Sequence, residues 1–159
     1  MRLLGLYIQN FKGIKGFMFE PNGKNANLYG DNATGKTTIA DAFSWLLFGK
    51  DSAGQAVFAI KPLDADNNEI HNLETSVEGK FEIQGKTVAL RKVFKEKWTK
   101  PRGKAKAEFS GHTTDHYVDG VPVTAGEYKQ RVGEIGDEEL FKILTDPSYF
   151  NEGLHWEKR

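Results

Sequence analysis

Several features are missing from this chain of 159 residues, and each absence excludes certain classes of protein. It contains no cysteine, which excludes disulfides and thiolate chemistry and fits a reducing compartment. Lysine plus arginine equals aspartate plus glutamate at 22 each, so no overall charge attracts nucleic acid or a membrane. The N-terminal apolar run ends at Gln9 and is too short for a signal peptide or a membrane span. We therefore expect a cytoplasmic domain with one hydrophobic core and no membrane contact.

The most specific pattern present is Gly-x-x-x-x-Gly-Lys-Thr at residues 30–37. Apolar residues at 26–29 predict a strand before it, and the helical spacing of Ile39, Phe43 and Leu46 predicts a helix after it. Glycines at both ends let the backbone curve around a polyphosphate, and a helix N-terminus favours an anion. The order of strand, loop and helix therefore predicts a nucleotide-binding P-loop.

The chemistry of this loop assigns a role to several of its side chains. Lys36 is expected to reach the β- and γ-phosphates of ATP, Thr37 to hold Mg²⁺, and Thr38 to serve the α-phosphate. Lys36 and Thr37 are thus the residues expected to act in catalysis. The loop residues predicted to bind the nucleotide are Gly30, Asn32, Ala33, Thr34, Gly35, Lys36, Thr37 and Thr38.

The middle of the chain predicts antiparallel strands. Residues 77–83 alternate apolar and charged side chains, Gln84-Gly85 supplies a two-residue turn, and residues 86–94 return as the partner strand. Further short strands are predicted at 105–110 and 116–119, followed by a turn at Asp119-Gly120. Earlier strands are expected at 2–9, 17–19 and 58–60.

The last third of the chain predicts helices. Thr124 can cap a helix over 125–135, and Glu127 completes a capping box. Asp137 can cap a second helix over 138–144, which is expected to bury Leu140, Phe141 and Leu144. A charged, helical start is expected after residue 154.

The opening of the chain resembles the SMC, RecF and SbcC group of ABC-type ATPases. The resemblance rests on a strand followed by Asn10-Phe-Lys-Gly13 and then by the loop at 30–38, and it is greatest to SbcC-like ATPases of bacteria and phages. It implies an α/β fold: the N-terminal half of an ABC-type P-loop NTPase head with an antiparallel β lobe. Within the single domain 1–159 it implies a P-loop core at 1–50, the lobe at 51–123 and a helical segment at 124–159 leading towards a coiled coil.

The same resemblance extends to individual residues. Lys12 matches a basic position near the phosphates, and Asn32 matches the asparagine of the loop, whereas Ala33 stands where the group usually has glycine. Lys61, Leu63 or Asp64 is expected near the nucleotide base. The magnesium-sensing glutamine of the group is missing, and Asp146 or Asn151 is its candidate replacement.

The resemblance also implies partners: the C-terminal half of the head, a second head, DNA in repair or recombination, and a nuclease subunit. Hydrolysis in such heads needs a strand ending in Asp-Glu and a Ser-Gly-Gly signature, and the sequence contains neither; Ser52-Ala-Gly-Gln55 only looks like the second. In the resembling group both lie beyond the coiled coil. We therefore expect these residues alone to bind ATP but to hydrolyse it poorly, which leaves open whether the chain itself is an enzyme.

Eight basic residues lie between positions 91 and 106, against one acid, Glu96, and with Trp98 among them. They are Arg91, Lys92, Lys95, Lys97, Lys100, Arg102, Lys104 and Lys106. Such a patch suits a nucleic-acid backbone with a ring for base stacking, and a solvated hairpin edge is the alternative.

Three other interpretations follow from the pattern. His112 and His116 stand four apart, but the extended backbone expected there separates such positions by about 13 Å, which argues against zinc. A nucleotide-gated DNA-binding or architectural module without catalysis is one alternative function. A small P-loop kinase is another, although the predicted hairpin fits neither an acceptor site nor a lid.

Overall fold

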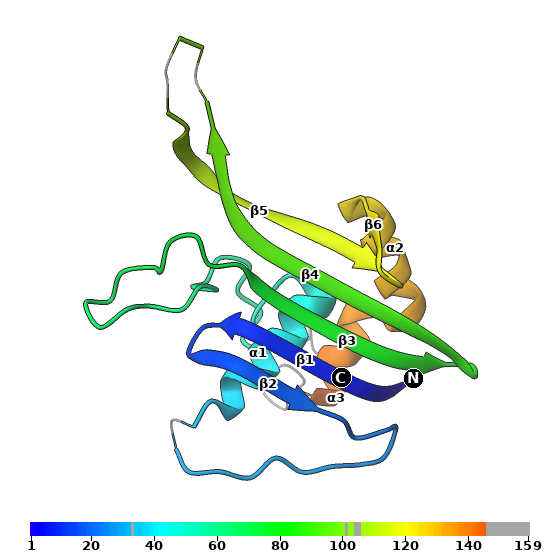
Figure 1. The fold of residues 1–159 in the computed structure, drawn as a ribbon. Helices are drawn as coiled ribbons and strands as arrows, with labels where there is room; N and C mark the ends of the chain where they lie inside the picture. Colours follow the sequence, from blue (N-terminus) through cyan, green and yellow to red (C-terminus); the bar gives the residue numbers. More distant parts are fainter. Residues whose placement is uncertain (33, 101, 104–105, 146–159) are drawn as a thin grey trace, which may run out of the picture.

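The computed structural model describes residues 1–32, 34–100, 102–103 and 106–145, and its centre is one six-stranded sheet of order β2-β1-β3-β4-β5-β6 (Figure 1). Every neighbouring pair of strands is antiparallel. The strands are β1 (Arg2–Phe11), β2 (Ile14–Phe19), β3 (Thr75–Ile83), β4 (Lys86–Thr99), β5 (Glu108–Val118) and β6 (Val121–Val123). The helices are α1 (Lys36–Phe48), α2 (Ala125–Ile135) and α3 (Glu138–Thr145). The mixed α/β class expected from the sequence is confirmed.

Two tight turns set the register of the sheet, and both were predicted. Gln84 and Gly85 between β3 and β4 have φ of 50° and 78°, and Asp119 and Gly120 between β5 and β6 have φ of 50° and 80°. Positive φ at both central residues is the turn geometry that matches the twist of antiparallel strands. Asp119 also accepts the amide of Ala89 at 2.7 Å, which fastens the second turn to β4.

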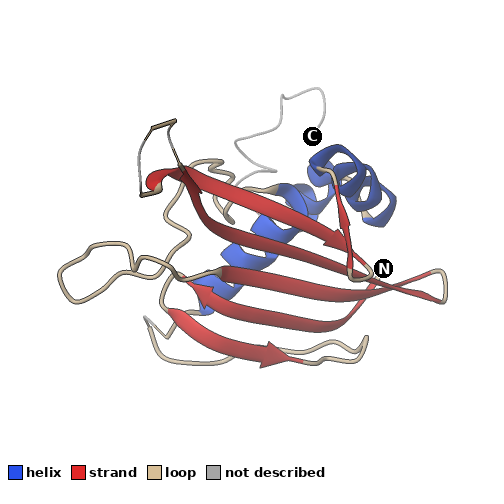
Figure 2. Cartoon of the chain, turned by 45° about the horizontal axis from the view of Figure 1, so that its top comes forward, coloured by secondary structure: helices blue, strands red, loops and turns tan. Residues whose placement is uncertain are grey.

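The helices lie on one face of the sheet, as Figure 2 shows, and α1 packs across β1, β3 and β4. Trp45 and Leu46 of α1 and Phe81 of β3 are all buried in this contact. Gly79 of β3 faces Leu46, and a Cβ at this glycine would lie 2.7 Å from the leucine Cδ2. The absence of a side chain at residue 79 therefore lets α1 approach the sheet closely.

The two C-terminal helices are capped as predicted. The Thr124 side chain accepts the Glu127 amide while Glu127 accepts from the Thr124 amide, which is a complete capping box. Asp137 accepts the Leu140 amide at 3.0 Å at the start of α3. Leu140 itself is 55% exposed, so its predicted burial is wrong. Phe141 is half-buried against Phe43 and Phe48, whereas the side chain of Leu144 lies outside the described part.

The predicted strands at 26–29 and 58–60 do not form; near the second segment, the Lys12 amide just after β1 donates one hydrogen bond to the Ile60 carbonyl at 2.7 Å, without a ladder. Leu28 and Tyr29 lie in neither a helix nor a strand, and their exposed fractions are 42% and 89%. The two short strands expected around 105–119 are one continuous strand, β5.

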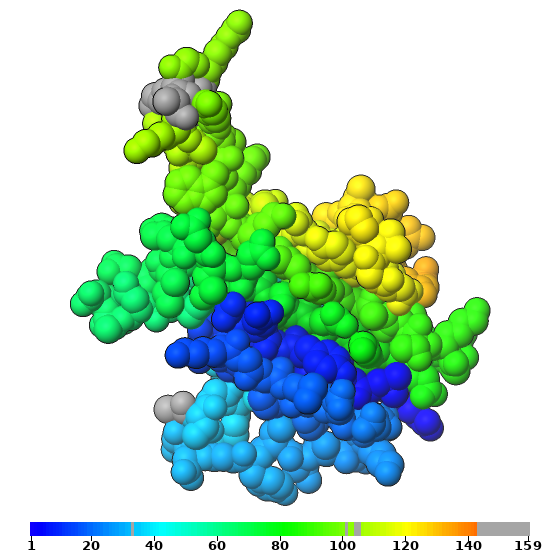
Figure 3. Space-filling model, in the orientation of Figure 1, coloured from blue at the N-terminus to red at the C-terminus, as the bar shows by residue number. Residues whose placement is uncertain are grey.

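The outer parts of β4 and β5 form a hairpin that projects from the body, visible at the top of Figures 1 and 3. The one sheet thus runs across residue 51, where the sequence suggested a boundary between core and lobe. In the described ranges, no helix has the length and apolar character needed to cross a membrane.

Candidate nucleotide-binding site

The N-terminus of α1 has the features of an anion site. Gly35 precedes the helix in the left-handed conformation, with φ of 93° and ψ of 12°, and no side chain caps the helix. The first turn of α1 carries no acidic residue. Its amides and the positive end of the helix dipole are therefore directed towards the loop at 30–35 without a competing carboxylate on the helix.

Lys36 spans the loop that leads into α1. Its ammonium donates to the backbone oxygens of Gly30 at 2.6 Å and Asp31 at 2.5 Å. The Thr34 hydroxyl donates to the same Asp31 oxygen at 2.8 Å. The first residue of α1 thereby holds a cation at the mouth of the loop.

The two glycines of the motif differ in their surroundings. A Cβ at Gly30 would lie 2.7 Å from the Thr34 hydroxyl oxygen, and Gly35 has a φ that side chains rarely adopt. The backbone conformation therefore favours glycine at residue 35, whereas a side chain at residue 30 would displace the Thr34 hydroxyl. The donors around this path are an ammonium group, the hydroxyl of the exposed Thr37 and backbone amides, which suit phosphate and a phosphate-bound cation.

Lys12 is directed at α1. Its ammonium lies 2.6 Å from the Asp41 carboxylate and 4.9 Å from the centre of the Phe58 ring. Asp41 also accepts the Ser52 amide at 3.0 Å and the Ser52 hydroxyl at 2.5 Å. Burial raises the pKa of Asp41, but these hydrogen bonds outweigh it and leave the pKa below its ordinary value.

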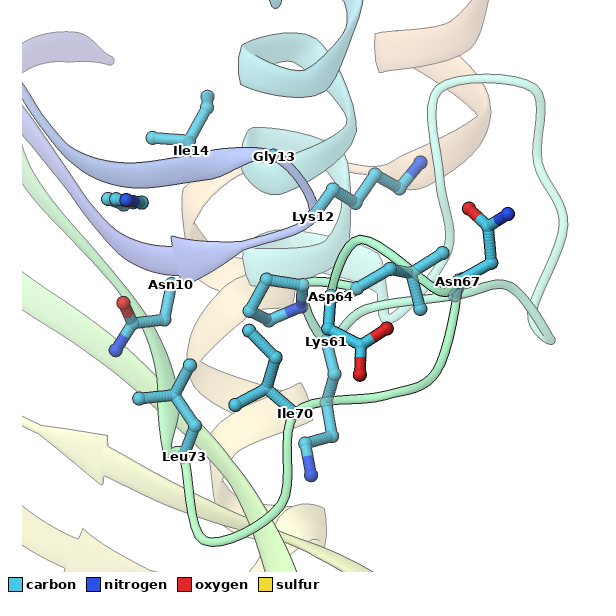
Figure 4. Close-up of a pocket in the computed structure, with 13 residues that line it drawn as sticks. Asn10, Lys12, Gly13, Ile14, Lys61, Asp64, Asn67, Ile70 and Leu73 are labelled. Atoms are coloured by element: carbon cyan, nitrogen blue, oxygen red, sulfur yellow. The ribbon is translucent and has the colours of Figure 1, made fainter.

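A cavity of about 740 Å³ lies beside the turn between β1 and β2 (Figure 4). Ile14 forms part of its wall and also lies 3.7 Å from the Cβ position of Gly35, so the cavity adjoins the phosphate loop. The three residues expected near the base, Lys61, Leu63 and Asp64, all line it. Ile70 and Leu73, which the sequence did not single out, add apolar wall.

The remaining predicted site residues are placed as follows. Asn32 is exposed in the loop, and Thr38 is half-buried on α1. Ala33, Asp146 and Asn151 lie outside the described residues. Asp41 and Ser52 were not predicted, and the only sequence signal for Asp41 is its position one helical turn after Thr37.

The structure divides the predicted basic patch. Lys92 is 5% exposed and donates to the Trp45 carbonyl at 2.7 Å, so its predicted place in a DNA-contacting surface is wrong. Lys95 is 2.5 Å from Asp115, and Arg91 lies over the Tyr117 ring. Lys104 is outside the described residues. The basic residues that are exposed on the projecting hairpin are Lys97, Lys100, Arg102 and Lys106.

The two histidines of the rejected zinc interpretation lie on β5 in different surroundings. The His112 ring stacks on Phe94 at 4.8 Å, and the His116 ring lies 4.9 Å from Tyr128. Burial, with the nearby charge of Lys92, lowers the pKa of His116. Across the described part of the chain, no three histidine, aspartate or glutamate side chains gather as metal ligands do.

Comparison with known proteins decides the family. A family model described as an AAA domain matches residues 6–148, which includes the loop, α1 and the whole of the sheet from β3 to β6. The chain belongs to this AAA domain family. No curated protein matches it.

Solved structures agree on the fold of this AAA domain. One, titled for the ATP-driven dimerization and DNA-stimulated activation of SMC ATPases, is 16% identical with a TM-score of 0.68, covering 100% of this chain and 96% of that one. Two others have TM-scores below one half: the SMC head domain from Thermotoga maritima at 20% identity and 0.49, and RecF with ATP at 15% and 0.48. They cover 96% and 78% of this chain, which spans 54% and 28% of their lengths. The match with a TM-score of 0.68, together with the family model, gives the chain the P-loop fold of an SMC-type ATPase head.

Proposed function

We propose that this AAA domain binds Mg-ATP as the N-terminal half of an ABC-type ATPase head. The observation that carries the proposal is the cation of Lys36 at the mouth of a loop that ends on the uncapped, acid-free N-terminus of α1. Lys36 would leave the two loop carbonyls for the phosphates, since charge-assisted bonds to phosphate are the stronger ones. The loop residues Gly30, Asn32, Ala33, Thr34, Gly35 and Thr38 would enclose the phosphates.

Thr37 would hold Mg²⁺, which supplies charge neutralisation at the β- and γ-phosphates. The base would enter the cavity beside Lys61, Leu63 and Asp64, whose apolar wall suits a flat ring. Lys12, which is paired with Asp41, would add positive charge near the phosphates. Asp146 or Asn151 would sense the magnesium ion.

The site is tested by calorimetric titration of the chain with Mg-ATP. Lys36→Ala should weaken binding at least about 10-fold, because a charge-assisted contact is lost, while Lys86→Ala on the exposed β3–β4 turn should leave it unchanged. Equal affinities of the wild type and Lys36→Ala would contradict the proposal.

Hydrolysis would take place in the complete head, where a C-terminal half supplies the Asp-Glu strand and a second head supplies the signature. The exposed segment at 26–29, whose sequence favours a strand, supports a missing strand partner there. ATP-driven head closure would act on DNA in cytoplasmic repair or recombination, with a nuclease subunit and a coiled-coil arm. Multiple turnover by these 159 residues alone would contradict this division of labour.

A second candidate is a nucleotide-gated DNA-binding module without hydrolysis. It is favoured by the exposed cations of the projecting hairpin. ATP-dependent DNA retention without phosphate release from the complete head would favour this alternative.

A further inference from the structure

Positive charge is concentrated on the projecting hairpin. Residues 97–109 contain five basic residues and one acid, whereas the whole chain has a formal net charge of zero. Lys97, Lys100, Arg102 and Lys106 are exposed there. Figure 3 shows that this hairpin projects from the body of the molecule. The hairpin is therefore the part of the chain best suited to a polyanion.

A row of aromatic rings runs along the same hairpin. The Trp98 and Phe109 rings are paired across the strands at 5.7 Å, Phe109 meets His112 at 5.2 Å, and His112 stacks on Phe94. Trp98 and Phe109 are 46% and 45% exposed. Their planes meet at 68°, so one ring presents its edge to the other, and nearly half of each side chain remains exposed to a ligand.

A hydrogen bond to a buried carboxylate orients the Trp98 ring. Its indole N–H donates to Glu96 at 3.0 Å, and the Glu96 side chain is 4% exposed and bound to the buried Lys61. An exposed ring whose orientation is already set loses little freedom when it binds a ligand. This distinguishes Trp98 from an apolar side chain left at random on a loop.

We propose that the outer part of the β4–β5 hairpin binds single-stranded nucleic acid. Trp98 and Phe109 take unstacked bases, and Lys97, Lys100, Arg102 and Lys106 contact the phosphates. Rings stack on bases only when the bases are outside a duplex, and cations beside stacking rings are the usual means of single-strand binding. A duplex would engage the cations alone.

This inference rests on the proposed nucleic-acid role of the chain and is independent of ATP binding. Charge favours nucleic acid over a protein partner, because protein interfaces are depleted in lysine, whereas four exposed cations lie on the same hairpin as the exposed rings.

The test is fluorescence anisotropy with the 159-residue chain and labelled oligo(dT) of about 20 nucleotides, beside a duplex of the same length. The wild type should bind oligo(dT) more tightly. Trp98→Ala should weaken oligo(dT) binding by about 5- to 100-fold and leave duplex binding nearly unchanged. Trp98→Phe should restore most of the loss, because it keeps a stacking face.

The salt dependence of binding tests the role of the cations, and a control variant lacks a cation outside the proposed surface. Lys100→Ala combined with Arg102→Ala should weaken both ligands and reduce the slope of log affinity against log salt by about 1.4 for oligo(dT). Arg91→Ala, which removes an exposed cation held over Tyr117, should change neither. Far-ultraviolet circular dichroism of each variant checks that the fold persists.

Three results would overturn the inference: tighter binding to the duplex, oligo(dT) binding that is unaffected by Trp98→Ala, or no binding to either ligand. The first two would leave the proposed DNA role intact, whereas the third would remove that role and point to a protein occupant. Lys36→Ala should bind oligo(dT) like the wild type, which separates this surface from the nucleotide site.

Discussion

The Lys61 ammonium lies 2.5 Å from the Glu96 carboxylate, and the two side chains are 0% and 4% exposed. Glu96 also accepts the Asn72 amide at 3.2 Å and meets His71 at 2.9 Å. One carboxylate on β4 thus fastens the segment from 61 to 72, which lines the cavity, to the base of the projecting hairpin.

Glu96→Gln should destabilise the chain above about pH 4.5 and have little effect near pH 2. The hydrogen bond from Lys61 lowers the pKa of Glu96 to about 2 against burial, which raises it. A carboxyl group with a lowered pKa in the folded state stabilises the fold above its ordinary pKa, and this stabilisation is lost as the pH falls from 4.5 to 2.

Urea unfolding of the two proteins across this range measures the difference. Glu82→Gln, which removes a looser and more exposed pairing with Arg2 at 3.8 Å, is the control and should change little. If the loss of unfolding free energy in Glu96→Gln stayed constant from pH 7 to pH 2, the lowered pKa of Glu96 would be contradicted.

Lys92 should make stability rise with pH in the alkaline range. Burial lowers its pKa from 10.5 to about 8, so between these values the unfolded chain binds a proton that the folded chain does not. The free energy of unfolding should therefore rise by up to about 3 kcal/mol relative to Lys92→Met, in which this group is absent. Denaturant unfolding of both proteins at pH 7 to 10.5 tests this. If the free energies of unfolding of the two proteins changed with pH in parallel, the prediction would be wrong.

Gly79→Ala should destabilise the chain by about 1–3 kcal/mol, because the new methyl group would meet Leu46 and Phe81, which are both fully buried. Gly133→Ala in α2 is the matched control, since its Cβ would meet nothing within 4 Å. That variant should gain up to about 1 kcal/mol from helix propensity. Equal effects of the two substitutions on the melting temperature would show that α1 does not approach the sheet at residue 79.

Features set by neighbouring residues could be predicted from the sequence. The turn at Gln84-Gly85 and the capping box of Thr124 and Glu127 depend on two to four consecutive positions, and both formed as expected. Gly35 of the loop has a positive φ, a conformation that favours glycine. Strand formation at 26–29 failed because apolar residues make a strand only where another strand supplies hydrogen bonds.

Contacts between distant segments could not be predicted in this way. The Lys12–Asp41 and Lys61–Glu96 pairs join residues 29 and 35 positions apart, and nothing local selects these partners. For Lys92 a signal was present: Val88, Leu90 and Lys92 alternate on the core face of β4, so the burial of this lysine follows from strand period. A basic patch defined by sequence position alone does not distinguish the two faces of the strand.

The most direct test of the account is a nuclear magnetic resonance titration of the ¹⁵N-labelled chain with Mg-ATP. If phosphates bind at the α1 N-terminus, the amide signals of Gly35, Lys36 and Thr37 should shift in a saturable way. The Lys36→Ala variant should need a much higher concentration of Mg-ATP to reach saturation. Amide signals in this stretch that stay in place at millimolar Mg-ATP, in a chain that is otherwise folded, would contradict nucleotide binding at this loop.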